Sequence, residues 1–212
     1  MIETMKRMVF TLMAAFAFVT AAFAQTPEEI LARMDKAMEP AEANGMSMAM
    51  DVKIPIIGTT TSMMYMLGDK VRSETTIMGH KLVTFSDGTT DWEYDTVNNE
   101  LTISDAIPGE DDGSEADMFS GITDDYDVKL KKETADAWYL ECKKSKNCQD
   151  KEAPDKMDLV VSKVTNLPVS LTAKISGVKC TLRDVKIGVS EELVRFDPAD
   201  YPDAKIVDKR KK

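Results

Sequence analysis

The sequence has one histidine, three cysteines and few aromatic residues, and each shortage narrows what the protein can do. Of its 212 residues, 7% are aromatic. The one histidine, His80, cannot form a multi-histidine metal site, and its place after Gly79 predicts an exposed turn. The G-x-S-x-G, G-x-G-x-x-G and Walker motifs are also absent. No nucleophile with a neighbouring base and no cofactor site is indicated, so we predict that the protein is not an enzyme.

The chain is also short of positive charge. It has 27 Lys and Arg against 37 Asp and Glu, a formal net charge of −10. A protein of this balance lacks the cations that displace counterions from a phosphate backbone, so nucleic acid is excluded as a partner. We interpret the basic run at residues 209–212 as a solvated tail.

A single long hydrophobic run is present, close to the first residue. Met8–Phe23 is almost wholly apolar, follows Lys6 and Arg7, and leads into Ala22-Phe23-Ala24, an A-x-A cleavage pattern. The run is short for a membrane span, and no Cys stands at the cleavage point for lipid attachment. We predict that residues 1–24 are a cleaved signal peptide. The mature chain then starts at Gln25, reaches the periplasm, and forms one domain over residues 25–208.

The three cysteines predict one disulfide in an oxidising compartment. Cys142 ends a strand-like run, and Cys148 follows after a short polar stretch. A bridge between them would close a loop of about 7 residues and contribute roughly 2–2.5 kcal/mol. Cys180 is left over on the apolar side of its strand, with Val178 and Leu182, and is expected to be buried and free.

A helix is predicted directly after the signal peptide. Thr26 is a suitable N-cap, Pro27 suits the first turn, and Glu29 completes a capping box. Ile30, Met34 and Met38 then recur every four residues. Pro40 ends this amphipathic helix, whose apolar stripe must cover other apolar residues.

From Gly45 onward the hydrophobic period changes from helical to two, which predicts a mainly β (α+β) fold with a curved antiparallel sheet. About eleven strands are expected, with residues 193–196 as a candidate short strand. The longer expected strands are 46–54, 59–67, 70–78, 126–132, 137–142, 156–162, 168–175 and 178–189, together with the three described next.

Residues 81–105 predict three short strands joined by two tight turns. Val83 and Phe85 alternate with polar neighbours, and Trp92 and Tyr94 share a face after the first turn. Asp91, Glu93 and Asp95 occupy the opposite face. One face of this meander is therefore aromatic and the other acidic, and we expect the aromatic face to line the core or a cavity.

The segment 105–125 breaks the strand pattern. It is rich in Asp and Glu, and its main apolar patch contains Met118, Phe119 and Ile122. A long segment without strand character is often functional, so we expect a movable lid over the sheet. The acidic residues 110–117 lack the spacing of an EF-hand loop, which favours a solvated loop over a calcium site.

Methionines form an unusual stripe on the first expected strand. Met46, Met48 and Met50 share a face, and thioethers are soft ligands for Cu(I). Alternate residues on a strand lie about 6.5–7 Å apart, so their sulfurs would have to bend together to share one ion. Adaptable packing in a core or a lipid cavity explains the stripe better, and a metal-binding module is the less favoured alternative.

The order of these parts resembles the periplasmic outer-membrane lipoprotein carrier family, LolA. A signal peptide, a helix and strands precede S-D-G-x-x-x-W-x-Y-D at residues 86–95. Residues 119–126, FSGITDDY, are similar to the family's lid and re-entry strand. The F-D-P of residues 196–198 and P-D-A-K-I-V-D of 202–208 resemble its closing motif. The resemblance spans roughly residues 26–208.

The resemblance implies an open antiparallel half β-barrel that shelters acyl chains of lipoproteins or other lipids. Its partners would be an inner-membrane donor and an outer-membrane acceptor. The expected lid is Met118, Phe119 and Ile122, and the expected cavity lining is Met34, Met38, Met46, Met48, Met50, Val83, Phe85, Trp92 and Tyr94. An alternative is an envelope sensor or interaction protein with the same fold. The family's lid-holding Arg is replaced here by Gly68, with Arg72 four residues later.

Overall fold

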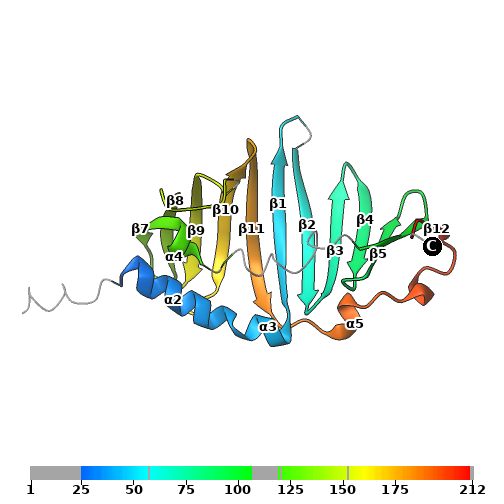
Figure 1. The fold of residues 1–212 in the computed structure, drawn as a ribbon, viewed down its shortest axis with the longest axis horizontal. Coiled ribbons are helices and arrows are strands. Elements are labelled where there is room, and N and C mark those ends of the chain that lie inside the picture. The colour runs from blue at the N-terminus through cyan, green and yellow to red at the C-terminus, as the bar shows by residue number, and fades with distance from the viewer. Residues whose placement is uncertain (1–24, 57, 107–118, 120, 152, 211–212) are drawn as a thin grey trace, which may run out of the picture.

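The computed structural model describes residues 25–56, 58–106, 119, 121–151 and 153–210. The predicted signal peptide therefore lies outside the described residues, as does the end of the basic tail. Twelve strands are described, and Figure 1 shows them side by side in one curved sheet. They are β1 (Met46–Ile54), β2 (Gly58–Leu67), β3 (Lys70–Ile77), β4 (His80–Ser86), β5 (Thr90–Asp95), β6 (Glu100–Asp105), β7 (Tyr126–Glu133), β8 (Ala137–Lys144), β9 (Lys156–Ser162), β10 (Pro168–Ile175), β11 (Val178–Ile187) and β12 (Lys205–Asp208).

The strands form two antiparallel meanders joined in the middle of the sheet. The order is β12-β6-β5-β4-β3-β2-β1-β11-β10-β9-β8-β7, so β1 pairs with β11 across more than a hundred residues of chain. The two edges, β7 and β12, do not pair with each other. The expected mainly β, open half-barrel is confirmed.

The N-terminal helix forms as its sequence predicts. In α2 (Pro27–Met38), the Thr26 hydroxyl accepts a hydrogen bond from the Glu29 amide, and the Glu29 carboxylate accepts one from the Thr26 amide. Beyond Pro40 the chain adds one more short helix, α3 (Pro40–Asn44). Figure 1 shows both helices running across the strand ends from β7 to β1. The predicted apolar stripe is buried through Ile30, Leu31 and Met34.

Two features of the C-terminal part differ from expectation. The candidate strand at residues 193–196 is wrong, because Glu191–Val194 forms a helical turn, α5, in which the Arg195 amide bonds to the Glu191 carbonyl. After the 3-10 turn η2 (Pro198–Asp200), the chain adds β12. β12 pairs with β6 in parallel, from Lys205 opposite Glu100 to Asp208 opposite Ile103.

The two faces of the sheet are distinguished by what packs on them. We call the face that carries Met46, Met48 and Met50 the inner face, because these residues share one core cluster with the buried residues of α2. The opposite face is the outer face. The cluster extends along β7–β11 and ends at Val71 on β3. Beyond β3, the main core therefore no longer follows the sheet.

Candidate functional site

Cross-strand pairing aligns apolar side chains across the inner face from β1 to β8. One row of paired residues crosses five neighbouring strands. In order, each pairing with the next, it consists of Met50, Leu182, Leu171, Leu159 and Leu140. A second row runs beside it through Val52, Cys180, Ala173, Met157 and Cys142. Because period-two alternation places each of these side chains on one face, the inner face of this half is apolar over its whole width.

A cavity opens in this apolar face. It has a volume of about 360 Å³ and lies over β9, β10 and β11. Ile122 and Tyr126 close one side, and Asp125 and Asp150 are the charged residues of its wall. The floor consists of Met50, Met157, Leu171, Ala173, Cys180 and Leu182. A concave, mainly apolar space of this size falls in the range of small-molecule sites.

Two ionisable groups of this region, Tyr126 and Cys142, are neutral at physiological pH. Burial raises the pKa of Tyr126 to about 12. Burial likewise raises the pKa of the Cys142 thiol to about 11. A thiol with so high a pKa carries almost no thiolate and is a poor nucleophile. Tyr126 and Cys142 therefore add no charge to the apolar surface of this region.

The predicted disulfide is absent. All three cysteines are free, and Cys142 is fully buried on the inner face between the pairing residues Met157 and Val128. Cys148 lies in the loop after β8, where its thiol is 3.5 Å from the Asp150 carbonyl oxygen. The bridge prediction is wrong because the side chain of Cys142 enters the core instead of turning toward the loop.

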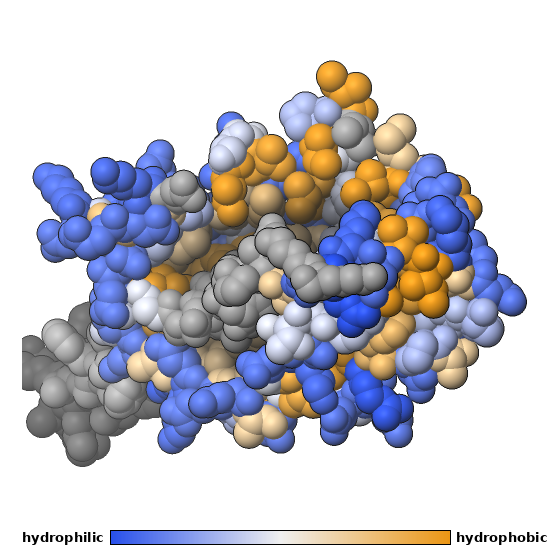
Figure 2. Space-filling view, turned by 45° about the vertical axis from the view of Figure 1, so that its right-hand side comes forward, coloured by the Kyte–Doolittle hydropathy of each residue, from blue (hydrophilic) through white to orange (hydrophobic). Residues whose placement is uncertain are grey.

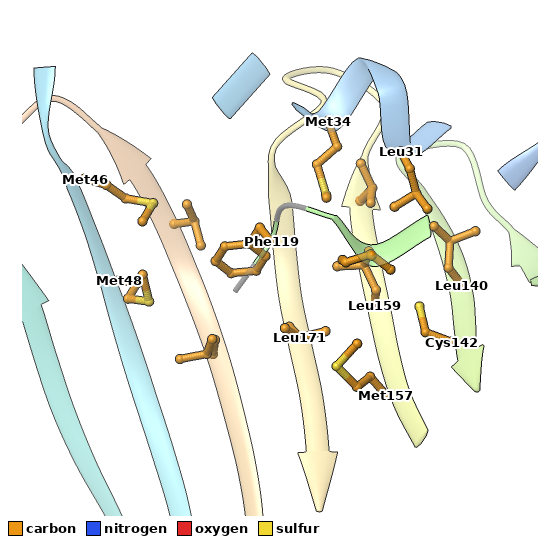
Figure 3. Packing of buried hydrophobic residues seen from close by; sticks show 14 of the residues in the cluster. Leu31, Met34, Met46, Met48, Phe119, Leu140, Cys142, Met157, Leu159 and Leu171 are labelled. Carbon is orange, nitrogen blue, oxygen red and sulfur yellow. The ribbon is translucent and has the colours of Figure 1, made fainter. Parts of the chain in front are cut away.

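The residues expected to form a lid are more deeply buried than a lid requires. Phe119 is 2% exposed, and its ring lies between Met46 and Met48 on one side and Leu171 on the other (Figure 3). Ile122 starts α4 (Ile122–Asp125) and is buried as well. Met118 and the acidic residues 110–117 lie outside the described residues. The expected partial exposure of Phe119 is therefore wrong, since this side chain is part of the core.

The expected cavity lining divides between the two faces. Met46, Met48 and Met50 lie on the inner face, Met34 packs there from α2, and Met38 packs against the same cluster. Pairing places the remaining four, Val83, Phe85, Trp92 and Tyr94, on the outer face. Their assignment to one cavity with the methionines is wrong. Met64 of the inner face pairs with Ser73, and Ser73 pairs with Thr84, so these two residues are on the inner face. The residues that alternate with them, including Phe85, therefore point to the outer face.

The outer-face aromatic residues pack under the C-terminal segment. Phe196 stacks on Trp92 with ring centroids 4.8 Å apart, and Tyr201 lies 4.6 Å from Tyr94. Phe85 contacts both covering rings edge-on. These residues form a second, smaller core, which Phe196 and Tyr201 of the C-terminal segment cover.

Arg72 belongs to the second core and not to the cavity. Its guanidinium lies 5.3 Å from the Phe85 ring centroid, pairs with Glu74, and donates a hydrogen bond to the Leu193 carbonyl. Gly68, where the sequence resemblance places the family's Arg, lies in the β2–β3 turn with φ 57°. Arg72 therefore fastens the C-terminal segment to the outer face.

The inner face of β3–β6 is polar. Ser73 and Thr84 are joined by a 2.8 Å hydrogen bond, and the Ser86 hydroxyl donates to the Asp91 carboxylate at 2.6 Å. A second cavity of about 360 Å³ lies here, bordered by Glu93 among others. The acidic face predicted for β5 is thus the one on the same side as the methionine stripe.

Several cavity residues were not foreseen as site residues. Met157, Leu171, Ala173 and Leu182 lie on strands whose alternation is visible in the sequence. The signal that places them beside Met50 is the pairing of β1 with β11, which no local pattern encodes.

The methionine stripe is accounted for by packing. Met46 and Met48 are almost fully buried, beside Met64 and Met66 of β2. Within the described part of the chain, no group of three His, Cys, Asp or Glu side chains is arranged to hold a metal ion.

Among the helices of the described residues, none is both long and apolar enough to cross a membrane.

Comparisons with known proteins give distant structural matches. No family model and no curated protein matches the chain. Among solved structures, an uncharacterised conserved protein from Thermus thermophilus is 18% identical with a TM-score of 0.48, covering 87% of this chain and 100% of that one. A LolA superfamily protein from Nitrosomonas europaea is 14% identical with a TM-score of 0.31, covering 82% and 99%.

MucB in the MucA/MucB complex of Pseudomonas aeruginosa is also similar, at 13% identity with a TM-score of 0.43. It covers 80% of this chain, which spans 61% of MucB. The matched structures thus include the superfamily that the sequence motifs resemble. Likeness at these identities assigns no function to this chain.

Proposed function

We propose that this protein binds the acyl chain of a lipid or lipoprotein in the apolar cavity over β9–β11 and acts as a non-enzymatic carrier or chaperone. The observation that supports the proposal is the cavity itself. Its floor is built from six apolar or sulfur-containing side chains, and its ionisable neighbours Tyr126 and Cys142 are neutral. Each methylene removed from water contributes about 0.8 kcal/mol, which favours an alkyl chain as the occupant.

The sheet is also open at both edges, which suits a long flexible ligand. β7 and β12 do not pair with each other, so the inner face can be entered from the side. The export signal predicted at residues 1–24 would deliver the protein to the periplasm. There, an inner-membrane donor and an outer-membrane acceptor would be its partners.

The proposal is tested by filling the cavity. Ala173 lies on its floor, and Thr172 is the next residue on the opposite face, opposite Thr181 of β11. In Ala173→Phe, the new ring occupies the space of the ligand, so the affinity for a fluorescent fatty acid should fall at least about tenfold. Thr172→Phe places the same ring on the outer face and should leave that affinity unchanged.

Thermal unfolding of both variants checks that each is folded. Unchanged fatty-acid affinity in a folded Ala173→Phe variant would contradict the proposed site. Absence of binding by the wild-type protein would favour the envelope interaction role instead.

A further inference from the structure

Three neighbouring hairpins end at the same end of the sheet. The strands β10-β11, β1-β2 and β3-β4 are consecutive in the sheet order, and each pair is closed by a short turn. Their turns are adjacent, since Lys53 lies opposite Lys179 and Thr61 lies opposite Thr76. We call residues 53–56, 58–59, 76–81 and 174–179 the hairpin rim. Figure 1 shows it at the upper end of the sheet, away from α2 and α3.

The tips of these hairpins expose large apolar side chains. Ile56 is completely exposed and Met78 is 81% exposed. Ile175 is 47% exposed and also borders the cavity over β9–β11. Figure 2 shows hydrophobic residues gathered at this upper end. A single exposed apolar side chain is ordinary, but one at each of three adjacent tips forms a row, with neighbouring hairpins about 10 Å apart.

The backbone at two of the tips disfavours the residues found there. Ile56 has φ 75° and Met78 has φ 52°. Positive φ is favoured for Gly and Asn, and a β-branched residue such as Ile rarely adopts it. Neither side chain gains compensating packing within the chain, because both are exposed. A residue that is unfavourable for its own turn and unpacked indicates a contact made outside this chain.

The charges of the rim are opposite to those of the protein as a whole. Lys53, Lys179 and Lys174 lie directly opposite one another on β1, β11 and β10. Like charges in this arrangement destabilise a sheet. No ion pair of the described residues includes these three lysines. The rim contains no Asp or Glu, in a chain whose formal net charge is −10.

We propose that the hairpin rim docks on a lipid bilayer with anionic headgroups. Ile56, Met78 and Ile175 enter the boundary between headgroups and acyl chains, and the lysine row faces the headgroup phosphates. An anionic bilayer offers an apolar layer for the separate hairpin tips and phosphates for the neighbouring lysines, so it can contact both at once. This docking goes beyond the proposed cavity and does not depend on what the cavity binds.

The test is binding of the mature protein to vesicles of phosphatidylcholine, with or without about one third phosphatidylglycerol, followed by flotation. The wild-type protein should bind the anionic vesicles and lose most of that binding at high salt. Ile56→Asn combined with Met78→Asn suits the positive φ of both positions, so folding is preserved. This variant should bind at least about tenfold more weakly.

Two further variants separate the contributions. Neutralising Lys53, Lys174 and Lys179 to Gln should weaken binding about a hundredfold and remove its salt dependence. Val164→Asn is the control, because Val164 is 82% exposed in the β9–β10 turn at the opposite end of the sheet. It should bind as the wild type does.

Wild-type protein that floats with neither vesicle overturns the docking proposal, as does a Val164→Asn variant that loses as much binding as the rim variant. Fatty-acid affinity is measured on the same samples. Rim variants should retain it, so failure of the docking proposal and failure of the cavity proposal give different results.

Discussion

The two ends of this sheet bury opposite faces. In the β7–β11 half, the inner face is apolar and the outer face carries ion pairs such as Glu141–Lys156. In the β3–β6 half, the inner face carries hydroxyls and carboxylates, while the outer face holds Phe85 and Trp92 under the C-terminal segment. The apolar side of the sheet changes at β2 and β3, where Met66 pairs with Val71.

The difference shows how one sheet can combine a stable core with an open site. The outer core of the β3–β6 half is closed by Phe196 and Tyr201 of the same chain. In the β7–β11 half, α2 and Phe119 cover part of the apolar face, and a cavity persists over β9–β11. Substitutions in the two halves should therefore affect stability and binding differently.

Phe119→Asp should have the largest effect. Losing a buried Phe costs roughly 3–5 kcal/mol, and an unpaired carboxylate in the same place adds to that cost. We therefore expect unfolding, or a loss of at least about 4 kcal/mol in the free energy of unfolding by urea titration. Phe119→Leu, which keeps the site apolar, should cost about 1.5 kcal/mol. A well-folded Phe119→Asp protein would mean that residue 119 is not core.

Trp92→Ala should separate stability from binding. Its ring stacks on Phe196 on the outer face, so truncation should cost about 2–3 kcal/mol. Fatty-acid affinity should not change, because no Trp92 atom faces the apolar cavity. Thermal unfolding and a fatty-acid titration on one preparation measure both quantities. A large loss of affinity in folded protein would place the ligand on the outer face.

Asp51→Asn should destabilise the outer face of the apolar half in a pH-dependent way. Hydrogen bonds from Arg183 and Thr61 lower the pKa of Asp51. Because the folded pKa is depressed, the stabilisation is fully present above the unfolded pKa of about 3.9 and is lost as the pH falls through the folded value. The variant should be less stable by about 1–2 kcal/mol near pH 7.

The same comparison at low pH supplies the control. The difference in unfolding midpoint between wild type and Asp51→Asn should shrink steadily as the pH falls through the lowered folded pKa of Asp51. A difference that persists unchanged from pH 7 to pH 2 would show that the carboxylate charge is not the cause.

Ser73→Ala should have the smallest effect. It removes the hydroxyl bond to Thr84 on the polar inner face, which is partly exposed and contributes about 1 kcal/mol or less. Chemical denaturation measures the change. A loss as large as that of Trp92→Ala would show that this face is a tightly packed core and not a polar surface.

Local patterns in the sequence predicted most of the elements. The capping box at Thr26 and Glu29, and the alternation in β1–β6, depend on neighbouring residues and were confirmed by the structure. The helical turn at Glu191–Val194 was missed because a four-residue segment is too short to show a period.

The two faces could not be assigned from the sequence. Trp92 and Tyr94 were correctly placed opposite Asp91 and Glu93, yet alternation does not say which side of a sheet is covered. That depends on Phe196, about a hundred residues away in the chain. In the same way, Cys142 and Cys148 are near each other in sequence, but the strand register turns Cys142 into the core.

The proposed binding of an acyl chain on the inner face over β9–β11 can be tested with a fatty acid that carries a photoreactive diazirine in mid-chain, followed by peptide mapping by mass spectrometry. We expect labelling of Met157, Leu171, Ala173 and Leu182, competed by unlabelled fatty acid. Labelling concentrated at Trp92, Tyr94 or Phe196 would contradict it.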